Sequence, residues 1–417
     1  MSPDHQLNHR MEQRYLLATQ VSFARDTDGR IWLDELWWRD LSFHLTYLEN
    51  LTVLAPCQRI ETPQAGMVQA VTQEDRKIEF IEIFPYGTLH TVMPHLLSGI
   101  WTTWKVVGDS DLVHSGVAGW PIPVGAIVNL VAVLRRKPLI IIIESAFWRL
   151  QPGSSERWKA RLRAWLTEHF AKWSMHQSTL GVYTHAGYRE SLPVGRNGTS
   201  AVLPASWILE RDIISFAAAE AAWDNKPTHP RFLMASRLER DKGIPFFLEI
   251  LHRLDMRGKA IELDVIGSGS MRPDIERFSK NAKSLKIRLL EPVPYGLPFM
   301  QLLRAYHGTI VPLTGDEQAR ILYDSFSQAV PVIATDTFGN REVVTDGDTG
   351  FLFPVDDPEA FADAVTFYAA NPAVLRKAGL SALSVAANYT HADMHRKRAE
   401  LLNKLFGTNR ANRALGQ

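Results

Sequence analysis

Two cations and a glycine follow a short apolar run in the second half of the chain. The run RFLMA (231–235) precedes Arg237, then Lys242 and Gly243, and Pro245 stands at a position suited to the first turn of a helix. Positive side chains beside a helix N-terminus attract a negatively charged diphosphate, and the positive end of the helix dipole adds to this attraction. The spacing therefore indicates a diphosphate-binding loop. The alternative is a solvated loop with ordinary surface charges.

Two acidic residues further along the chain, Asp316 and Asp324, are separated by eight positions, and we expect the first in a loop and the second about two helical turns further on. If helical rise separates them, the two carboxylates lie about 12 Å apart, at ~1.5 Å per residue. That distance is too long for sharing one proton or one metal ion, but it suits an elongated ligand held at two places. The backbone amides of residues 318–321 would lie at the start of this helix, where they can bind phosphate. Two solvated acids at a helix terminus are the alternative.

Short apolar runs alternate with amphipathic segments throughout the second half. RFLMA, ELDVIG, IRLLE, GTIVPL and PVIAT have strand length, whereas IPFFLEILHRL, MRPDIERFSK and ARILYDSFSQ have helical periodicity. Strands that alternate with helices form a parallel sheet with helices on both faces. The sequence therefore predicts a doubly wound α/β domain, in which ligands bind at the carboxyl ends of the strands.

The first half of the chain has a similar but less regular pattern. We expect YLLATQVSFA to be an opening strand, LDELWWRDLSFHLTYLE a helix, and LTVLAP, IEFIEIF, LVHSG, LIIIIES and LGVYTHA further strands. Two prolines and an asparagine interrupt regular structure within 221–230, which is where we place the hinge. We therefore expect Rossmann-like domains at 1–225 and 226–388. A C-terminal helix within 389–417 is expected to pack back toward the first domain.

Length, composition and charge restrict the class of protein. The 417 residues are 46% apolar and 22% charged, with a formal net charge of +1, which fits two globular domains. This charge gives no general attraction to nucleic acid. Cys57 is the only cysteine, so a disulfide framework within one chain is excluded. The polar N-terminus has no signal-peptide features, and the apolar stretches 124–134 and 139–143 are too short to span a bilayer, so we expect a cytoplasmic protein.

One local basic segment occurs at residues 156–176. Trp158, Leu162, Trp165 and Trp173 share a helical face, and five basic residues surround it: Arg157, Lys159, Arg161, Arg163 and Lys172. Such a helix can lie in the interface of an anionic bilayer, where a lipid-linked acceptor would be found. The alternative is a helix that packs its tryptophans inward and leaves its charges in water. The first interpretation predicts peripheral contact with the inner face of the membrane.

The motifs of the second half occur together in the order and spacing of a known family. Residues 231–386 resemble the donor domain of family 4 of the retaining glycosyltransferases, which belong to the group 1 glycosyltransferases and have the GT-B fold of two Rossmann-like domains facing a cleft. The matching motifs are Ser236-Arg237-Leu238, Asp241-Lys242-Gly243, Ile266-Gly267-Ser268-Gly269, Asp316-x7-Asp324, Ala329-Val330-Pro331-Val332 and Glu342…Asp346-Gly347-Asp348-Thr349-Gly350. The resemblance implies transfer of a sugar from a nucleoside-diphosphate sugar to an acceptor hydroxyl with retention. We expect a carbohydrate or lipid-linked acceptor, and a role in bacterial polysaccharide or glycoconjugate synthesis.

The resemblance implies roles for individual residues. Arg237 and Lys242 would hold the donor diphosphate and stabilise the leaving group electrostatically, in place of a metal ion. Asp324 would bind the ribose hydroxyls and Asp316 the donor sugar. Both family acids are glutamates, however, and Glu317 stands next to Asp316 and could replace it.

Further donor contacts follow from the same likeness. Gly267 and Gly269 would let the nucleotide approach the backbone closely, and the loop VPYG (293–296) would lie near the base. Gln318 and Arg320 stand where the family has a Phe-Gly pair and the residues after it, so we include them among the candidate donor contacts. These departures leave the identity of the sugar open.

The first half is less similar to the family. His114, in the run DLVHSG, matches a common strand-end histidine, although a structural histidine is an equal alternative. Glu144 follows the strand LIIII, where relatives often carry a histidine near the reacting sugar. A carboxylate there could orient an acceptor hydroxyl or the donor sugar. The alternative for Glu144 is a helix cap or an ion-paired acid.

The sequence disfavours a metal-dependent transferase but leaves two other classes open. Asp-x-Asp occurs at Asp26/Asp28, Asp109/Asp111 and Asp346/Asp348, and we expect none of these pairs to bind a catalytic metal. No cofactor is expected beyond the sugar nucleotide as donor substrate. The alternatives are a nucleotide-sugar epimerase of the same fold and a non-catalytic nucleotide-sugar-binding protein. A dehydrogenase is disfavoured, because Gly267-Ser268-Gly269 lacks the third glycine of the dinucleotide motif.

Overall fold

Strands and helices alternate along the whole second half of the chain, as the periodicity predicts. The computed structural model describes residues 10–71, 77–150 and 158–407. Within them, parallel strands form a C-terminal sheet in the order β13-β12-β11-β14-β15-β16. This is the 3-2-1-4-5-6 order of a doubly wound sheet. The strands are β11 (Arg231–Ala235), β12 (Glu262–Ile266), β13 (Lys286–Leu290), β14 (Gly308–Val311), β15 (Val332–Thr335) and β16 (Gly350–Phe353).

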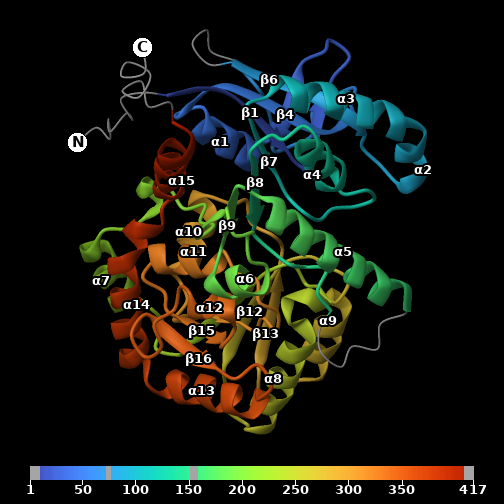
Figure 1. Ribbon diagram of the computed structural model, residues 1–417. Helices are drawn as coiled ribbons and strands as arrows, with labels where there is room; N and C mark the ends of the chain where they lie inside the picture. Colours follow the sequence, from blue (N-terminus) through green and yellow to red (C-terminus); the bar gives the residue numbers. More distant parts are fainter. Residues whose placement is uncertain (1–9, 72–76, 151–157, 408–417) are drawn as a thin grey trace.

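Helices bury both faces of this sheet. Along β11, Phe232 and Met234 pack in one hydrophobic cluster and Leu233 packs in another, because successive side chains of a strand point to opposite faces. The helices are α7 (Phe216–Asp224), α8 (Ile244–Met256), α9 (Arg272–Asn281), α10 (Leu297–Leu303), α11 (Ile321–Ser327), α12 (Phe338–Arg341), α13 (Pro358–Ala370) and α14 (Pro372–Ala386). The parallel α/β architecture predicted for this half is confirmed (Figure 1).

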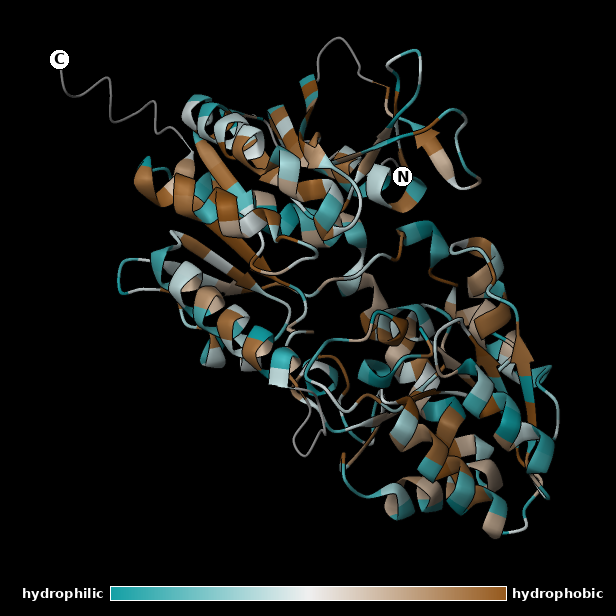
Figure 2. Ribbon diagram, turned by 90° about the vertical axis from the view of Figure 1, so that its right-hand side faces the viewer, coloured by the Kyte–Doolittle hydropathy of each residue, from teal (hydrophilic) through white to brown (hydrophobic). Residues whose placement is uncertain are grey.

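The N-terminal sheet has a parallel part and an antiparallel extension. The parallel part runs β10-β9-β8-β7-β1-β4, with β6 also on β4, and β2, β3 and β5 extend it. Its strands are β1 (Met11–Ala18), β2 (Phe23–Arg25), β3 (Ile31–Asp34), β4 (Leu48–Arg59), β5 (Met67–Gln69), β6 (Lys77–Pro85), β7 (Leu112–Ser115), β8 (Leu139–Ile143), β9 (Leu180–Tyr183) and β10 (Thr199–Val202). The helices are α1 (Glu35–His44), α2 (Leu89–Val92), α3 (Leu96–Asp109), α4 (Val124–Leu134), α5 (Trp158–Gln177) and α6 (Ala186–Ser191). Strands at the centre of both lobes are strongly hydrophobic (Figure 2).

Helix α1 is shorter than its sequence pattern suggests. The side chain of Asp34 accepts hydrogen bonds from the amides of Leu36 and Trp37 and so fixes the start of the helix. The predicted continuation to Glu49 is wrong, because Leu48 already pairs with Met11 of β1 as the first residue of β4. The apolar pattern of these few residues fits both a helix and a strand, and the parallel pairing with β1 determines that they form a strand.

Two segments connect the lobes. After β10 the chain passes to the C-terminal lobe, where α7 packs against α14, so residues 221–224 of the predicted hinge belong to a helix on that lobe. Helix α15 (His391–Phe406) returns and packs against α1, with Ala399 and Leu402 in the cluster that contains Leu41 (Figure 1). Among the described helices, none has the length and apolar character needed to cross a bilayer.

Candidate functional site

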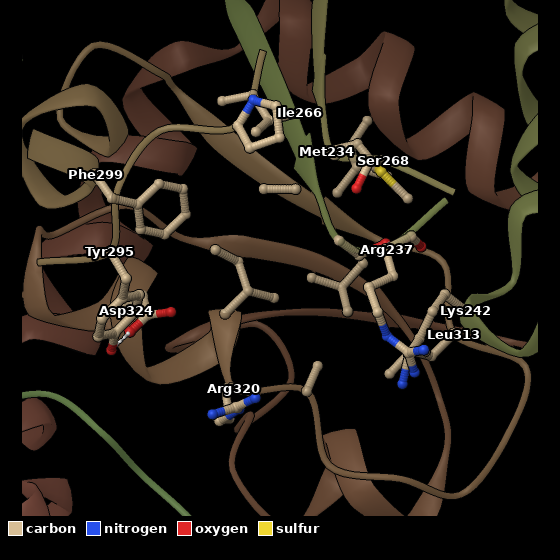
Figure 3. Close-up of a pocket in the computed structure, with 18 of the residues that line it drawn as sticks. Met234, Arg237, Lys242, Ile266, Ser268, Tyr295, Phe299, Leu313, Arg320 and Asp324 are labelled. Atoms are coloured by element: carbon tan, nitrogen blue, oxygen red, sulfur yellow. Dashed lines mark hydrogen bonds between the residues drawn. The ribbon is translucent and has the colours of Figure 1, made fainter. Parts of the chain in front are cut away.

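A cavity of about 520 Å³ opens at the carboxyl ends of β11 and β14 (Figure 3). Ser236 and Arg237 after β11 and Pro312 and Leu313 after β14 line it. These neighbouring strands lie at the point where the strand order reverses, which is where open α/β sheets bind ligands. Its volume lies within the usual range for small-molecule sites.

One end of the cavity is basic. Arg237 and Lys242 both line it, and the Lys242 side chain is only 13% exposed. Gly243 has φ of +76°, and a Cβ there would lie 1.8 Å from the carbonyl oxygen of Pro312. Glycine is therefore required where the cation loop turns into α8. The sequence-predicted cation pair is brought together at a wall of the cavity.

A carboxylate already contacts the buried cation. Lys242 Nζ donates to Glu317 Oε1, and Ser145 Oγ donates to Glu317 Oε2 at 3.3 Å. Ser145 lies just after β8 of the N-terminal sheet, so Glu317 connects the two lobes at the cavity. An anionic ligand that binds Lys242 must compete with this carboxylate.

The opposite end of the cavity holds a buried acid. Tyr295 Oη donates a hydrogen bond of 2.7 Å to Asp324 Oδ1, and Phe299 packs nearby (Figure 3). Burial raises the pKa of Asp324 to about 7, although the Tyr295 hydrogen bond acts in the opposite direction. This carboxyl therefore keeps its proton to a higher pH than an exposed aspartate does. The loop 293–296 lines the cavity through Val293 and Tyr295.

The two predicted aspartates have different surroundings. Asp316 lies in a loop, as expected, but helix α11 begins only at Ile321, so the 12 Å estimate from helical rise does not apply. Asp316 is exposed and is not among the residues that line the cavity, whereas Glu317 is. The loop also packs closely on Gly339, where a Cβ would lie 2.4 Å from the carbonyl oxygen of Glu317. The geometry therefore favours Glu317 over Asp316 as the acid that reaches a ligand.

Gln318 supports the loop from inside the protein, whereas Arg320 lines the cavity. The buried Gln318 side chain donates to Thr184 O at 3.0 Å and accepts from Tyr323 Oη at 2.7 Å, so its amide is committed to protein partners. Arg320 lines the cavity and stacks over Trp207, with its guanidinium carbon 5.0 Å from the ring centroid. Gln318 therefore holds the loop against the N-terminal lobe.

The two glycines of the Gly267-Ser268-Gly269 motif let two loops pack together. A Cβ on Gly267 would lie 1.9 Å from Ser236 O, and one on Gly269 would lie 2.4 Å from Leu238 O. Gly267 lines the cavity, and Gly269 lies outside it. Close packing of the protein backbone is sufficient to require both glycines.

The two candidates from the first half are not among the residues that line the cavity. His114 is buried against the Tyr15 ring, and burial lowers its pKa well below the usual range. Glu144 is exposed just after β8, and desolvation by the surrounding protein raises its pKa. Its neighbour Ser145 makes the contact with Glu317. In the sequence, the only signal for Ser145 is its position at the end of a predicted strand.

The three Asp-x-Asp pairs each have an acid with a protein partner. Asp26 accepts from Trp32 Nε1 at 2.9 Å, and Asp111 pairs with Arg14 at 3.0 Å. Asp346 Oδ1 accepts from the amide of Leu352 at 2.9 Å. These acids thus have structural roles.

The donor-domain motifs match a family model. Residues 229–371 match the family described as "Glycosyl transferases group 1". The α-D-kanosaminyltransferase of Streptomyces kanamyceticus is 25% identical over 143 residues, which cover 33% of this chain and 35% of that protein. The D-inositol 3-phosphate glycosyltransferase of Nocardia farcinica is 28% identical over 184 residues, covering 42% and 41%. The matches thus span less than half of these relatives.

Solved structures extend the likeness to both lobes. Sucrose-phosphate synthase of Thermosynechococcus elongatus has a TM-score of 0.70 at 15% identity, covering 95% of this chain and 100% of that one. Anabaena HepE in complex with UDP and glucose has a TM-score of 0.63 at 14% identity, covering 94% and 100%. At this identity the likeness establishes the fold alone. Together, the comparisons show a group 1 glycosyltransferase domain over residues 229–371 and the GT-B fold over both lobes.

Proposed function

We propose that the protein transfers a sugar from a nucleoside-diphosphate sugar to an acceptor hydroxyl, with retention of the anomeric configuration. The main support is the cavity at the switch point of the C-terminal sheet, which has Arg237 and Lys242 at one end and the buried Asp324–Tyr295 pair at the other. A nucleoside diphosphate has this polarity, with its anionic phosphates at one end and its ribose hydroxyls near the other. The family match over the same residues supports the same donor class.

In the proposed reaction, the two cations stabilise the charge that grows on the departing diphosphate. Lys242 acts from a largely buried position, where its charge is less screened, and Arg237 acts from the solvent edge. The departing phosphate oxygen takes the proton of the acceptor hydroxyl, so no enzyme nucleophile is used. Glu317 or Asp316 contacts the donor sugar. A metal ion is not required for this chemistry.

The proposed acceptor is a carbohydrate or a lipid-linked carbohydrate, and the proposed setting is bacterial polysaccharide or glycoconjugate synthesis. The matched relatives are bacterial transferases, among them the EpsD protein of Bacillus subtilis, with 37% identity over 62 residues. An epimerase or a purely binding function is less well supported, because the named relatives are transferases.

A lipid-linked acceptor is supported by an apolar surface on the N-terminal lobe. Residues 156 and 157 lie outside the described part, but along α5 Trp158 is 68% exposed and Trp165 56%. The inward packing considered above is therefore wrong for this half of the helix. Helix α3 packs against α4, as α5 does, and its Leu97 and Trp101 are also exposed.

Cations accompany these aromatic residues. Lys159 lies over the Trp158 ring and Lys105 over Trp101, and Arg161 and Arg163 follow on α5. Exposed tryptophans beside lysines and arginines suit the interface of an anionic bilayer. We therefore propose peripheral contact between this surface and the inner face of the membrane.

A donor screen tests the proposed activity. Purified protein is mixed with individual sugar nucleotides, thermal shift identifies those that bind, and release of free nucleoside diphosphate is then measured for each. We expect at least one sugar nucleotide to stabilise the protein and to be slowly hydrolysed. A product that is an isomeric sugar with free UDP would point to the epimerase, and binding without turnover, with or without acceptor extracts, to the binding protein.

A further inference from the structure

A buried group of polar side chains lies where α15 meets α1. Asp40 comes from α1, and His391 and His395 come from the first two turns of α15, at a spacing that places them on one helix face. The two histidines are almost completely buried, and the Asp40 side chain is 19% exposed. None of the three is among the described residues that line the donor cavity.

The three polar atoms form a closed triangle. Asp40 Oδ1 lies 3.0 Å from His391 Nε2 and 3.0 Å from His395 Nε2, and the two nitrogens are 3.2 Å apart. Each Nε2 carries at most one proton, and an ionised carboxylate carries none. Two N–H protons cannot supply a hydrogen bond along each of the three sides of the triangle. If both nitrogens donate to Asp40, two N–H groups face each other at 3.2 Å; if one does not, its lone pair faces the carboxylate.

A cation at the centre satisfies all three atoms at once. Zinc–nitrogen and zinc–oxygen bonds of about 2.0–2.2 Å, at angles of roughly 90–110°, place ligand atoms about 2.8–3.6 Å from one another. The three observed separations lie in this range. We propose that Asp40, His391 and His395 bind one divalent transition-metal ion, with Zn²⁺ preferred, and that the ion fastens α15 to α1. Two imidazoles and one carboxylate suit Zn²⁺, Co²⁺ or Ni²⁺ better than Mg²⁺ or Ca²⁺.

Neighbouring side chains orient two of the three ligands, Asp40 and His395, whereas the buried His391 Nδ1 has no hydrogen-bond partner in the described part of the chain. Arg398 has only donors, and its Nη1 lies 3.2 Å from His44 Nε2, so His44 carries its proton on Nδ1. That nitrogen lies 3.0 Å from the backbone oxygen of Asp40 and 3.5 Å from Oδ2, which leaves Oδ1 for the ion. The Nδ1 of His395, protonated when Nε2 binds metal, lies 3.3 Å from Tyr47 Oη. Such outer contacts are typical of histidine metal ligands.

Aromatic rings enclose the two imidazoles. Phe43 stacks on the His395 ring and Trp207 on the His391 ring.

The ion would fix a helix that reaches the donor cavity. Leu36 of α1 lines that cavity one turn before Asp40, and Arg39 lies over the ring of Tyr295, the partner of Asp324. Fastening α15 to α1 therefore sets the position of the N-terminal lobe against the nucleotide pocket. The site is structural and separate from the proposed sugar transfer, so either proposal can fail without the other.

Metal content of the full-length protein tests the site. Wild-type protein is loaded with Zn²⁺, desalted and analysed for bound metal, and the visible spectrum is recorded after Co²⁺ substitution. The comparison variant is the double substitution His391→Gln and His395→Gln, which keeps polar side chains that can bond Asp40. His90→Gln, at an exposed histidine of α2, is the matched control.

We expect about one equivalent of Zn²⁺ in the wild type and in His90→Gln, and at least tenfold less in the double variant. The wild-type Co²⁺ form should show the absorption of a four- or five-coordinate nitrogen–oxygen site, and Zn²⁺ should raise its melting temperature. Circular dichroism and nucleoside diphosphate binding identify a double variant that fails to fold, in which case Asp40→Asn replaces it. Wild-type protein that retains no Zn²⁺ after loading, or retains as much as a folded variant, would overturn the proposal.

Discussion

The carboxylate of Glu317 contacts the ammonium group of Lys242 in the cavity where the donor diphosphate is proposed to bind. The contact neutralises the better buried of the two cations that line this end. A bound diphosphate must take over Lys242 from this carboxylate, and Glu317 would then be free to contact the donor sugar.

Replacing Glu317 by Gln should therefore strengthen binding of a free nucleoside diphosphate roughly three- to tenfold. The substitution removes a competitor for Lys242 and a negative charge near the phosphates, an effect on the order of 1 kcal/mol. Calorimetric titration measures the change. Asp241→Asn is the control, because Asp241 lies 3.8 Å from Lys242 at a more exposed position and should change affinity less.

Transfer rates of the same variant identify the acid that contacts the sugar. If Glu317 has this role, Glu317→Gln lowers the rate while nucleotide affinity rises, and Asp316→Asn changes both only slightly. If Asp316→Asn lowers the transfer rate and Glu317→Gln does not, Asp316 is the acid that contacts the sugar, as the family spacing implies.

The protonation of Asp324 should appear as a pH dependence of stability. An unfolded aspartate loses its proton near 3.8, whereas folded Asp324 keeps it to about 7. Between these values the unfolded state binds fewer protons, so the contribution of Asp324 to stability falls as pH rises and stays low above 7. The substitution Asp324→Asn removes this loss in the free energy of unfolding, which is up to roughly 4 kcal/mol. The asparagine also preserves a hydrogen-bond acceptor for Tyr295.

Denaturant unfolding of wild type and Asp324→Asn at pH 5 and pH 8 measures this difference. The variant should gain stability over the wild type as pH rises. Tyr295→Phe serves as a comparison, because it removes the hydrogen bond and leaves the acid buried. An equal difference at both pH values would show that the folded-state pKa is not raised.

The C-terminal lobe and its cation loop could be predicted from the sequence, because strand periodicity and glycine spacing are local properties. The end of α1 could not, since parallel pairing of Leu48 with Met11 overrides the helical pattern. The orientation of Glu317 rather than Asp316 toward the cavity depends on Gln318 anchoring the loop to Thr184 of the other lobe. The Asp40 and histidine triangle joins residues about 350 positions apart, a distance over which residue spacing carries no information.

Metal dependence of turnover gives a separate prediction. Brief EDTA treatment should leave sugar transfer nearly unchanged, since Arg237 and Lys242 supply the positive charge at the diphosphate end. The assay is run on wild type and on the double variant at His391 and His395, which separates a structural ion from a catalytic one. Activity lost in both proteins and restored by Mn²⁺ would contradict the proposed chemistry.

Membrane contact should depend on the basic residues of α5. Charge reversal of Arg161 and Arg163 to Glu should reduce binding to vesicles containing anionic lipid several-fold, and high salt should weaken wild-type binding through screening. Vesicle co-sedimentation measures both effects. Reversal of Arg277 and Lys280, on α9 of the other lobe, is the control. Binding that is absent, or equal for all three proteins, would leave the exposed tryptophans without a membrane role.

The most direct test of the proposed donor site is calorimetric titration of wild type and Lys242→Met with a panel of nucleoside diphosphates. The substitution keeps most of the side-chain volume and removes the charge that faces the diphosphate. We predict that the wild type binds at least one nucleoside diphosphate and that the variant binds it more weakly by about 1.5–3 kcal/mol, or roughly 10- to 150-fold. Equal affinity in a folded variant, or a wild type that binds none of the panel, would contradict the proposal that this cavity holds the sugar donor.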